Sequence, residues 1–140
     1  MASITTSCPF CDPKERVFKE NEHAYCLLSN PRLMPGHLLV IPKRHVEKPW
    51  ELSDEEVRDI FSLIKFLQQK IVPALATGVD VRQHYRPFLP ESRTKVNHVH
   101  YHVLPRTFQD ELWLKVESHD QELFRDLSKE EQKRITKLID

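Results

Sequence analysis

Glycine is scarce in this chain: only Gly36 and Gly78 occur among 140 residues. A glycine-rich phosphate-binding loop needs several glycines close together, so the Walker and dinucleotide-binding loops are both excluded. Long apolar runs are also missing, because the stretch from Leu38 to Ile41 is far shorter than the roughly 20 residues that span a bilayer. The N-terminus lacks the pattern of a secretory signal, so we expect a cytoplasmic protein.

Net charge is absent as well, because 21 basic residues balance 21 acidic ones. No overall electric field favours nucleic acid or a membrane, and we expect neither as a partner. Any binding site for an anion must therefore be built locally. A length of 140 residues with 39% apolar composition predicts one globular domain spanning residues 1–140.

The three cysteines form an odd number, which argues against a disulfide framework. Cys26 lies in an apolar stretch and is interpreted as a small buried residue. Cys8 and Cys11 have C-x-x-C spacing, which is compatible with zinc, with redox chemistry or with neither. A thioredoxin-type pair would precede a helix, whereas Asp12-Pro13 follows here. A structural zinc site would need two further ligands.

Turn signals and apolar patterns predict the order of strands and helices. Strands are expected within residues 16–30 around a turn at 20–22, at 37–41 after the Pro35-Gly36 turn, at 79–85 and at 96–104. One long helix lies between them and short helices end the chain. This order predicts an α+β domain with a mainly antiparallel sheet, one long helix and a helical C-terminal tail.

The clearest helix signal begins at Ser53, which forms a capping box with Glu56. Apolar residues follow at spacings of three and four, a pattern that predicts one face packed on the core: Val57, Ile60, Phe61, Ile64, Leu67 and Ile71. Pro73 limits the length of this helix. In the tail, Ser118 and Ser128 each stand at a cap-like start of a short helix.

Three of the eight histidines alternate with apolar residues, at His98, His100 and His102. In an extended strand their rings share one face, which must look into a cleft or solvent. The outer two would be roughly 13 Å apart, too far to share one zinc ion with bonds of about 2 Å. We therefore favour catalysis over a pure metal site or an inert surface strand. Imidazole, partly neutral near pH 7, suits nucleophilic attack on phosphorus.

The run His98-Val99-His100-Tyr101-His102-Val103-Leu104 resembles the His-x-His-x-His-x-x motif of the histidine triad (HIT) superfamily, in which each x is apolar. The segment from Pro35 to Lys43 resembles the Pro-Gly-His strand that these proteins carry some sixty residues earlier. The resemblance covers about residues 8–106 and leaves 107–140 as a tail. The end of the motif resembles the fragile histidine triad and bacterial branches of the superfamily.

This resemblance implies a homodimeric α+β domain, without an organic cofactor, that cleaves a nucleotide at its α-phosphate. His100 is then the nucleophile, His102 a hydrogen-bond donor to the phosphate or the leaving group, and His37 and His98 the residues that orient the nucleophile. The implied substrate is a dinucleoside polyphosphate or a nucleotide phosphoramidate, hydrolysed through a nucleotidyl-histidine. A nucleotidyltransferase or phosphorylase, and a non-catalytic nucleotide-binding module, are the alternatives.

Two segments depart from the pattern of the family. Arg93-Thr94-Lys95 stands where the family carries Gly-Gln-Ser/Thr, which supplies phosphate donors. Cationic side chains there either replace those donors, because arginine binds phosphate bidentately, or are solvated loop charges. Ser29 aligns with the ribose-binding acid or amide of the family, and Asn30 lies one place later. We treat all five residues, with His102, as candidate substrate ligands.

The cysteine pair also fits the resemblance. Several bacterial HIT proteins, and galactose-1-phosphate uridylyltransferases, resemble this chain in opening with C-x-x-C, and their other ligands are a histidine after the Pro-Gly-His strand and the first triad histidine. His45 and His98 match these positions, so the resemblance implies a structural zinc held by Cys8, Cys11, His45 and His98. A metal-free fold is the alternative. The remaining histidines are interpreted as ordinary surface or hydrogen-bonded residues: His23, His84 and His119.

Overall fold

The computed structural model describes residues 8–13 and 16–140 of the chain. It consists of two compact units, the first ending at Phe108 and the second comprising Gln109–Asp140. All the strands found in the described residues, and the long helix, belong to the first unit, whereas the second contains only helices and their connections. No helix among the described residues is both long and apolar enough to cross a bilayer.

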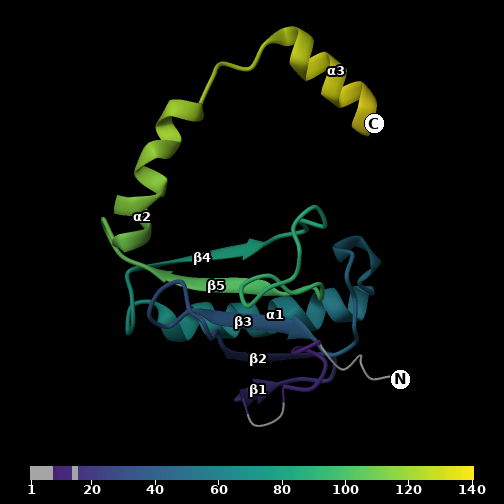
Figure 1. Cartoon of the computed structure of the whole chain (residues 1–140), viewed down its shortest axis with the longest axis vertical. Helices are drawn as coiled ribbons and strands as arrows, with labels where there is room; N and C mark the ends of the chain where they lie inside the picture. The colour runs from purple at the N-terminus through teal and green to yellow at the C-terminus, as the bar shows by residue number, and fades with distance from the viewer. Residues whose placement is uncertain (1–7, 14–15) are drawn as a thin grey trace. The chain divides into compact units, whose positions relative to one another are not determined.

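The first unit is built on one five-stranded sheet. Its strands are β1 (Lys19–Glu20), β2 (Ala24–Leu28), β3 (Leu38–Pro42), β4 (Gly78–Gln83) and β5 (Tyr101–Arg106). They lie in the order β1-β2-β3-β5-β4, and every neighbouring pair is antiparallel (Figure 1). The predicted α+β class and antiparallel sheet are confirmed.

The segment before β5 corrects the prediction of one long histidine strand. β5 contains His102, but His98 and His100 lie in irregular backbone that precedes it. The pairing between β3 and β5 ends at Val40 and Tyr101, and beyond it the Pro42 carbonyl accepts from His98 Nε2 at 2.9 Å. The backbone of Val99 bonds instead to the Val46 carbonyl. As a result, the three histidines do not share one face.

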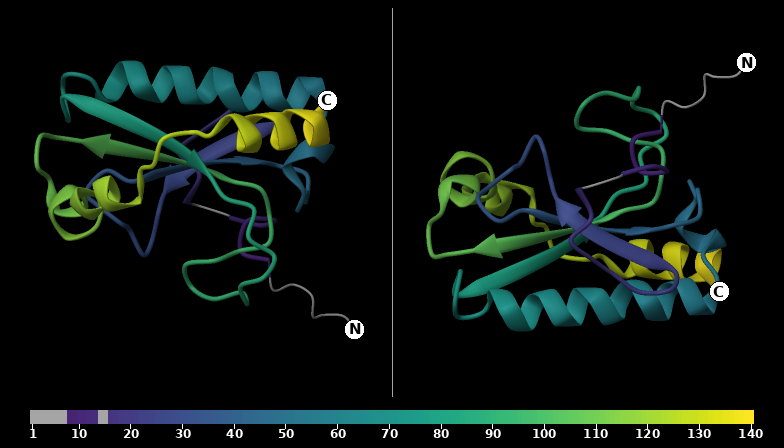
Figure 2. Two further views of the ribbon diagram at one scale, coloured as in Figure 1. Left: turned by 90° about the horizontal axis from the view of Figure 1, so that it is seen from above. Right: turned by 90° about the horizontal axis from the view of Figure 1, so that it is seen from below.

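Helix α1 (Asp54–Ile71) lies on one face of the sheet (Figure 2). Its capping box is confirmed, because Ser53 Oγ accepts from Glu56 N at 3.0 Å and Glu56 Oε1 accepts from Ser53 N at 2.8 Å. The predicted apolar face is largely correct, with Leu63 added to it. Val57 and Phe61 were wrongly placed in the core. Both are more than 40% exposed at the margin of the buried stripe, and Phe61 contacts Tyr101 edge to face.

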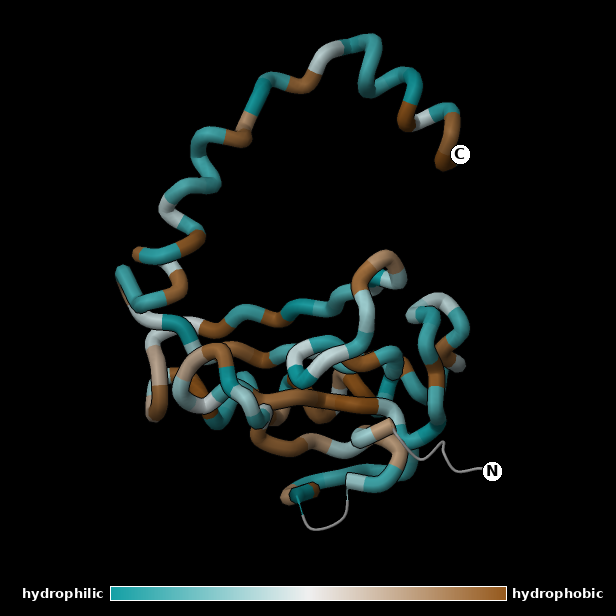
Figure 3. Tube along the Cα trace, viewed as in Figure 1, coloured by the Kyte–Doolittle hydropathy of each residue, from teal (hydrophilic) through white to brown (hydrophobic). Residues whose placement is uncertain are grey.

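Alternate strand residues divide between two cores. The larger core lies between the sheet and α1 and includes Val40, Val103 and Ile64. The smaller core lies on the other sheet face and is formed by Phe10, Tyr25, Leu27, Leu39 and Ile41. Because both faces of the central strands are covered, β2 and β3 are apolar along most of their length (Figure 3).

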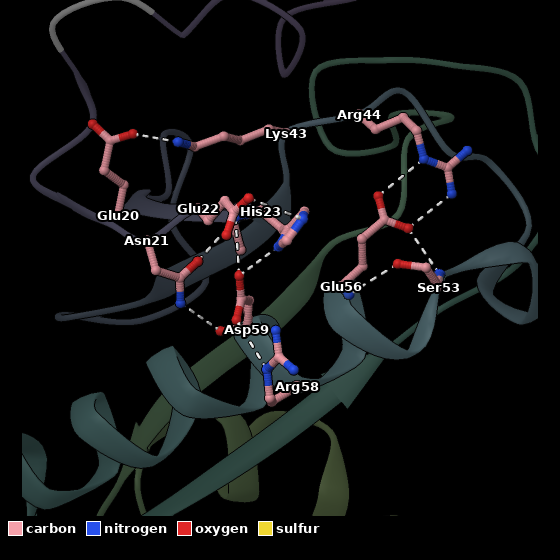
Figure 4. Close-up of polar contacts among 11 residues, drawn as sticks. Glu20, Asn21, Glu22, His23, Lys43, Arg44, Ser53, Glu56, Arg58 and Asp59 are labelled. Carbon is pink, nitrogen blue, oxygen red and sulfur yellow. Dashed lines mark hydrogen bonds and ion pairs between the residues drawn. The ribbon is translucent and has the colours of Figure 1, made fainter.

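Polar contacts fix the loop that follows β3. A short 3₁₀ helix, η3 (Pro49–Glu51), lies in this loop just before α1. Arg44 pairs with Glu56 through Nε at 3.0 Å and a terminal nitrogen at 2.8 Å (Figure 4). Glu56 is buried, so this bidentate pair and the Ser53 cap together satisfy its carboxylate. Nearby, His23 Nδ1 donates to Asp59 Oδ2 at 2.7 Å, which gives His23 a structural role.

The second unit contains α2 (Glu111–Lys115), the 3₁₀ helix η4 (Glu117–Leu123) and α3 (Lys129–Ile139). Ser128 caps α3 as predicted, because its hydroxyl accepts from Glu131 N at 3.0 Å. A short helix is present near Ser118 as predicted, but Ser118 does not cap it: the residue lies inside η4 and its hydroxyl donates to the Leu114 carbonyl. Asp110, which the sequence analysis did not identify, caps α2.

Candidate active site

A cavity of about 540 Å³ is lined by alternate residues of β3, β4 and β5 that point away from α1. In the ladder, Leu39 of β3 and Arg82 of β4 are the two direct neighbours of His102 on β5. Because paired residues point to the same side of a sheet, these three side chains form the floor of the cavity. His37 and His84, two residues from Leu39 and Arg82, also line it.

His100 presents one ring nitrogen with a free lone pair. Its Nδ1 lies 2.7 Å from the His98 carbonyl, which can only accept, so Nδ1 carries the proton. The lone pair is then on Nε2, and the residue lines the cavity. Burial lowers the pKa of His100, partly offset by the hydrogen bond to His98, so the ring is neutral near pH 7. A neutral imidazole with an unprotonated Nε2 is a competent nucleophile.

A relay of hydrogen bonds sets the opposite tautomer at His102. Leu33 N donates to His37 Nδ1 at 2.9 Å, so the proton of His37 is on Nε2. His37 Nε2 lies 2.9 Å from His102 Nδ1 and donates to it. His102 therefore carries its own proton on Nε2. The donor chain ends at the cavity that His102 lines, where this N–H is available to a bound ligand.

Burial keeps both rings of this relay neutral. It lowers the pKa of His37 to about 4 and that of His102 to about 3, and the nearby histidines lower both further. The family resemblance implied that His37 orients the nucleophile; in the structure the His37 ring nitrogen Nε2 donates to His102. The rings of His100 and His102 are 4.9 Å apart, so a lone pair and a donor lie side by side.

The predicted substrate ligands are largely brought together. Besides His102, the cavity is lined by Ser29, Asn30, Arg93 and Thr94. Lys95 is not among the lining residues of this cavity. It pairs with Ser92 to close the turn that carries Arg93 and Thr94, and its Nζ donates to Asn97 Oδ1. The side chain is thereby turned toward its own loop.

Sequence reasoning missed several cationic and titratable residues of the cavity. His84 was left without a role, yet its ring centre is 5.3 Å from that of His102, and burial lowers its pKa. Four arginines besides Arg93 also line the cavity: Arg16, Arg32, Arg82 and Arg86. The alternation of positions 82, 84 and 86 was the available signal, because every second residue of an extended segment shares a face.

Beside the cavity, Cys8, Cys11, His45 and His98 converge on one point. One ligand atom from each lies within 4.8 Å of all the others. The Cys8 Sγ–His98 Nδ1, Cys11 Sγ–His45 Nδ1 and Cys11 Sγ–His98 Nδ1 distances are 3.4, 3.2 and 3.7 Å. Ligand atoms of a tetrahedral zinc with bonds of about 2.0–2.3 Å are about 3.3–3.8 Å apart, which these distances approach. The four residues thus fit a tetrahedral metal ion.

The outer nitrogens of both histidines support the same conclusion. His98 Nε2 donates to the Pro42 carbonyl and His45 Nε2 to Glu47 Oε2, each at 2.9 Å. Both Nδ1 atoms are therefore unprotonated and suited to bind a cation. Burial raises the pKa of Cys11 to about 11, and the neighbouring Cys8 adds to this rise. Two adjacent thiolates need a cation to offset their charge, and sulfur with imidazole is a zinc donor set.

Two residues, His98 and Phe10, connect the cysteine–histidine cluster to the cavity. The ring of His98 belongs to the cluster, and the carbonyl of His98 accepts a hydrogen bond from Nδ1 of His100. Phe10, between the two cysteines, lies edge-on to the rings of His98 and His100 at 5.9 and 5.1 Å, and its carbonyl accepts from the Tyr25 hydroxyl. The C-x-x-C loop therefore forms part of the cavity wall.

Comparison with known proteins gives one consistent family. The HIT domain family model matches residues 12–109. The chain is 31% identical over 117 residues to the nitrilase and fragile histidine triad fusion protein NitFhit of Caenorhabditis elegans, covering 79% of this chain and 26% of that protein. It is 29% identical over 98 residues to the asymmetrical bis(5'-nucleosyl)-tetraphosphatase of Schizosaccharomyces pombe, covering 68% and 51%. An adenosine 5'-monophosphoramidase of the same yeast is 38% identical over 74 residues, covering 51% and 49%. The chain thus spans about half or less of these relatives.

Solved structures agree with the fold. A HIT family protein from Bacillus subtilis matches with a TM-score of 0.73 at 24% identity, covering 95% of this chain and 94% of that one. A zinc-bound histidine triad family protein from Mycobacterium smegmatis matches with a TM-score of 0.63 at 26% identity, covering 77% and 81%.

Proposed function

We propose that this chain, which belongs to the HIT domain family, is a nucleotide hydrolase that forms a covalent nucleotidyl-histidine on His100. The substrate is a dinucleoside polyphosphate or a nucleotide phosphoramidate. The observation that carries the proposal is the pairing of tautomers in one cavity, with the free lone pair of His100 beside the N–H of His102. Relatives named for tetraphosphatase and phosphoramidase activity support the same class of reaction.

In the first step, His100 Nε2 attacks the α-phosphorus and the bond to the leaving group breaks, its electron pair staying on the leaving atom. A polyphosphate leaves as an oxyanion, whereas the nitrogen of a phosphoramidate takes up a proton from solvent and leaves as an amine. The His102 N–H stabilises the charge that develops on a phosphate oxygen or on the leaving atom. The His98 carbonyl, bonded to Nδ1, stabilises the imidazolium-like ring of the intermediate. In the second step, water attacks phosphorus, the P–N electron pair returns to Nε2, and the proton of the water passes to solvent.

We further propose that Cys8, Cys11, His45 and His98 hold zinc with a structural role. Their interatomic distances and the protonation pattern of the two imidazoles support this assignment, as does the zinc-bound relative of known structure. When bound, the ion supplies positive charge that keeps both cysteines as thiolates. It thereby fixes the loop that carries Phe10 against the cavity.

We also propose that the protein is a homodimer in the cytoplasm. Within residues 8–13 and 16–140, β4 is an edge strand with a partner only on the β5 side, and α1 exposes Val57 and Phe61. An unpaired strand edge and exposed apolar side chains favour self-association. Three free cysteines are typical of a reducing compartment.

The decisive experiment is incubation with nucleotides labelled at the α-phosphate, followed by a search for an acid-labile adduct. We expect the adduct on wild-type protein, none on His100→Ala, and an unchanged yield on the tail variant His119→Ala. Turnover without added phosphate identifies a hydrolase, and turnover that requires phosphate identifies a phosphorylase instead. A folded protein that binds nucleotide but gives neither adduct nor turnover would be a binding module, and the proposal would be wrong.

A further inference from the structure

The cavity concentrates positive charge in a chain that has no net charge. Twenty residues line it, and they include no aspartate or glutamate, although the chain carries 21 acidic residues. Five of the lining residues are arginines: Arg16, Arg32, Arg82, Arg86 and Arg93. One α-phosphate, which the proposed mechanism already places against His100 and His102, does not require five guanidinium groups. The excess indicates a ligand with several negative charges.

The arginines fall into two groups on either side of the histidines. Arg16 donates to the Leu28 carbonyl at 2.8 Å, at the end of β2, and Arg32 lies in the β2–β3 loop near Ser29 and Asn30. The other three come from β4 and from the connection between β4 and β5. Since β5 lies between β3 and β4, Arg82 on β4 stands on the side of His102 opposite to β3 and the β2–β3 loop.

The second group contains two guanidinium groups that are available to a ligand, as is that of Arg32 in the first group. Arg82 is already engaged, because it donates to Asp80 Oδ2 at 3.1 Å. By contrast, Arg86 and Arg93 make no side-chain hydrogen bond or ion pair with any residue of 8–13 or 16–140. Both are exposed, and both line the cavity. A planar guanidinium without a protein partner can bind a phosphate group bidentately.

We infer that the cavity selects nucleotides whose leaving group itself carries two or more phosphates, and that Arg86 and Arg93 bind those phosphates. This inference rests on the proposed function, since it assigns a substrate class to the same site. When His100 attacks the α-phosphorus of such a substrate, the P–O bond to the next phosphate breaks and negative charge grows on the departing oxygen. Guanidinium groups beside that chain stabilise the charge. The uncharged amine that leaves a phosphoramidate gives them nothing to bind.

Direct binding tests the inference without any need for turnover. We expect inorganic tripolyphosphate to bind wild-type protein in calorimetry, with an affinity that falls as salt rises. Loss of one charged hydrogen-bonding group weakens such binding by about tenfold, so Arg86→Gln and Arg93→Gln should each have this effect. Arg93→Lys, which keeps the charge but not the bidentate geometry, should give an intermediate loss. The matched control Arg58→Gln changes an exposed arginine of α1 that does not line the cavity, and it should bind like wild type.

Turnover tests the selectivity. In wild type we expect kcat/KM to rise from adenosine phosphoramidate to diadenosine triphosphate and again to the tetraphosphate. Arg86→Gln and Arg93→Gln should lower kcat/KM for the tetraphosphate about tenfold, and several times less for the phosphoramidate. Equal losses on both substrates, or losses no larger than those of Arg58→Gln, would overturn the inference.

Failure of the inference can be told from failure of the proposed function. If the His100 adduct forms but neither arginine affects tripolyphosphate binding or substrate preference, the hydrolase stands and the leaving-group site is wrong. If tripolyphosphate binds through Arg86 and Arg93 but no nucleotide gives an adduct, the polyanion site stands and the catalytic proposal is wrong. Absence of tripolyphosphate binding to folded wild type overturns the inference directly.

Discussion

The two faces of the sheet are made from alternate residues of the same strands, yet they are built for different purposes. On the α1 face, Val40 and Val103 pack against an apolar helix stripe and contribute mainly to stability. On the other face, Leu39 shares its register with His102 and Arg82, and polar groups there are kept at fixed protonation states by specific partners. Chemistry and packing are therefore separated by the alternation of residues along each strand and not by distance along the chain. Substitutions can therefore test each face independently.

The largest effect is expected at the nucleophile. His100→Ala should lower kcat by about 10⁴-fold or more, because His100 is the ring whose lone pair a backbone contact fixes beside the His102 donor. Its melting temperature should remain within a few degrees of wild type, since the residue lines a cavity. Steady-state kinetics and thermal unfolding measure the two. A variant that loses stability and activity together would break the separation of the faces.

Loss of the metal should have the next largest effect, on the cavity face. Removal of zinc by a chelator, or Cys8→Ser, should lower the free energy of unfolding by about 4 kcal/mol, because a ligand that binds only the folded state stabilises it by mass action. Metal analysis and urea unfolding with and without added zinc provide the check. The control Cys26→Ala changes a buried cysteine of the α1 face, so it should lower stability yet keep its metal. Equal metal content in Cys8→Ser and wild type would contradict the assignment.

On the α1 face we expect stability to change while the chemistry does not. Ile64→Ala removes a side chain that is 2% exposed, and such truncations cost about 2–5 kcal/mol. The free energy of unfolding should fall by about 3 kcal/mol, within that range. The kcat of the folded fraction should stay within about twofold of wild type, because the residue faces away from the cavity. Urea unfolding measures the free energy of unfolding, and kinetics combined with active-site titration measure kcat per folded molecule. A large fall in kcat per folded molecule would show that the faces are coupled.

The smallest effect is expected from pH. The pKa values of His37 and His102 are lowered to about 4 and 3, mainly by burial, so both rings stay neutral in the fold while the unfolded chain takes up protons below about pH 6.5. Their contribution to stability is therefore complete above about pH 6.5 and is lost as the pH falls toward 4. Urea unfolding of chelated protein between these values measures the slope. His37→Asn should flatten it, compared with the control His119→Asn, and an unchanged slope would contradict this account.

Local signals were enough to predict the helix and most of the sheet. Ser53, Glu56 and the spacing of apolar residues define α1, because capping and amphipathic periodicity act over a few residues. The four-residue metal set could be named in advance only because the resemblance to the family supplied two of its members. The structure brings those members together.

Tertiary contacts decided what the sequence did not predict. The prediction that strand alternation extends to His98 was wrong. The His98 ring donates to the Pro42 carbonyl, and the segment before Tyr101 is not paired with β3. The place of His84 in the cavity was missed although the strand predicted at 79–85 includes it, because one histidine in a strand shows no function until the neighbouring strands form a cavity beside it. Lys95 could be assigned to the turn rather than the cavity only once its contact with Asn97 was seen.

His98 makes two attachments with different parts of the same residue. Its ring belongs to the cysteine cluster, and its main-chain oxygen fixes the tautomer of His100. Every substitution keeps this main-chain oxygen, but loss of the ring would loosen the backbone that holds the oxygen against His100. Metal affinity and nucleophilicity would then change together, and the kinetics of such a variant could not be divided between them. An exchange of His98 for cysteine is the informative design, because a thiolate can still bind zinc while the peptide oxygen is untouched.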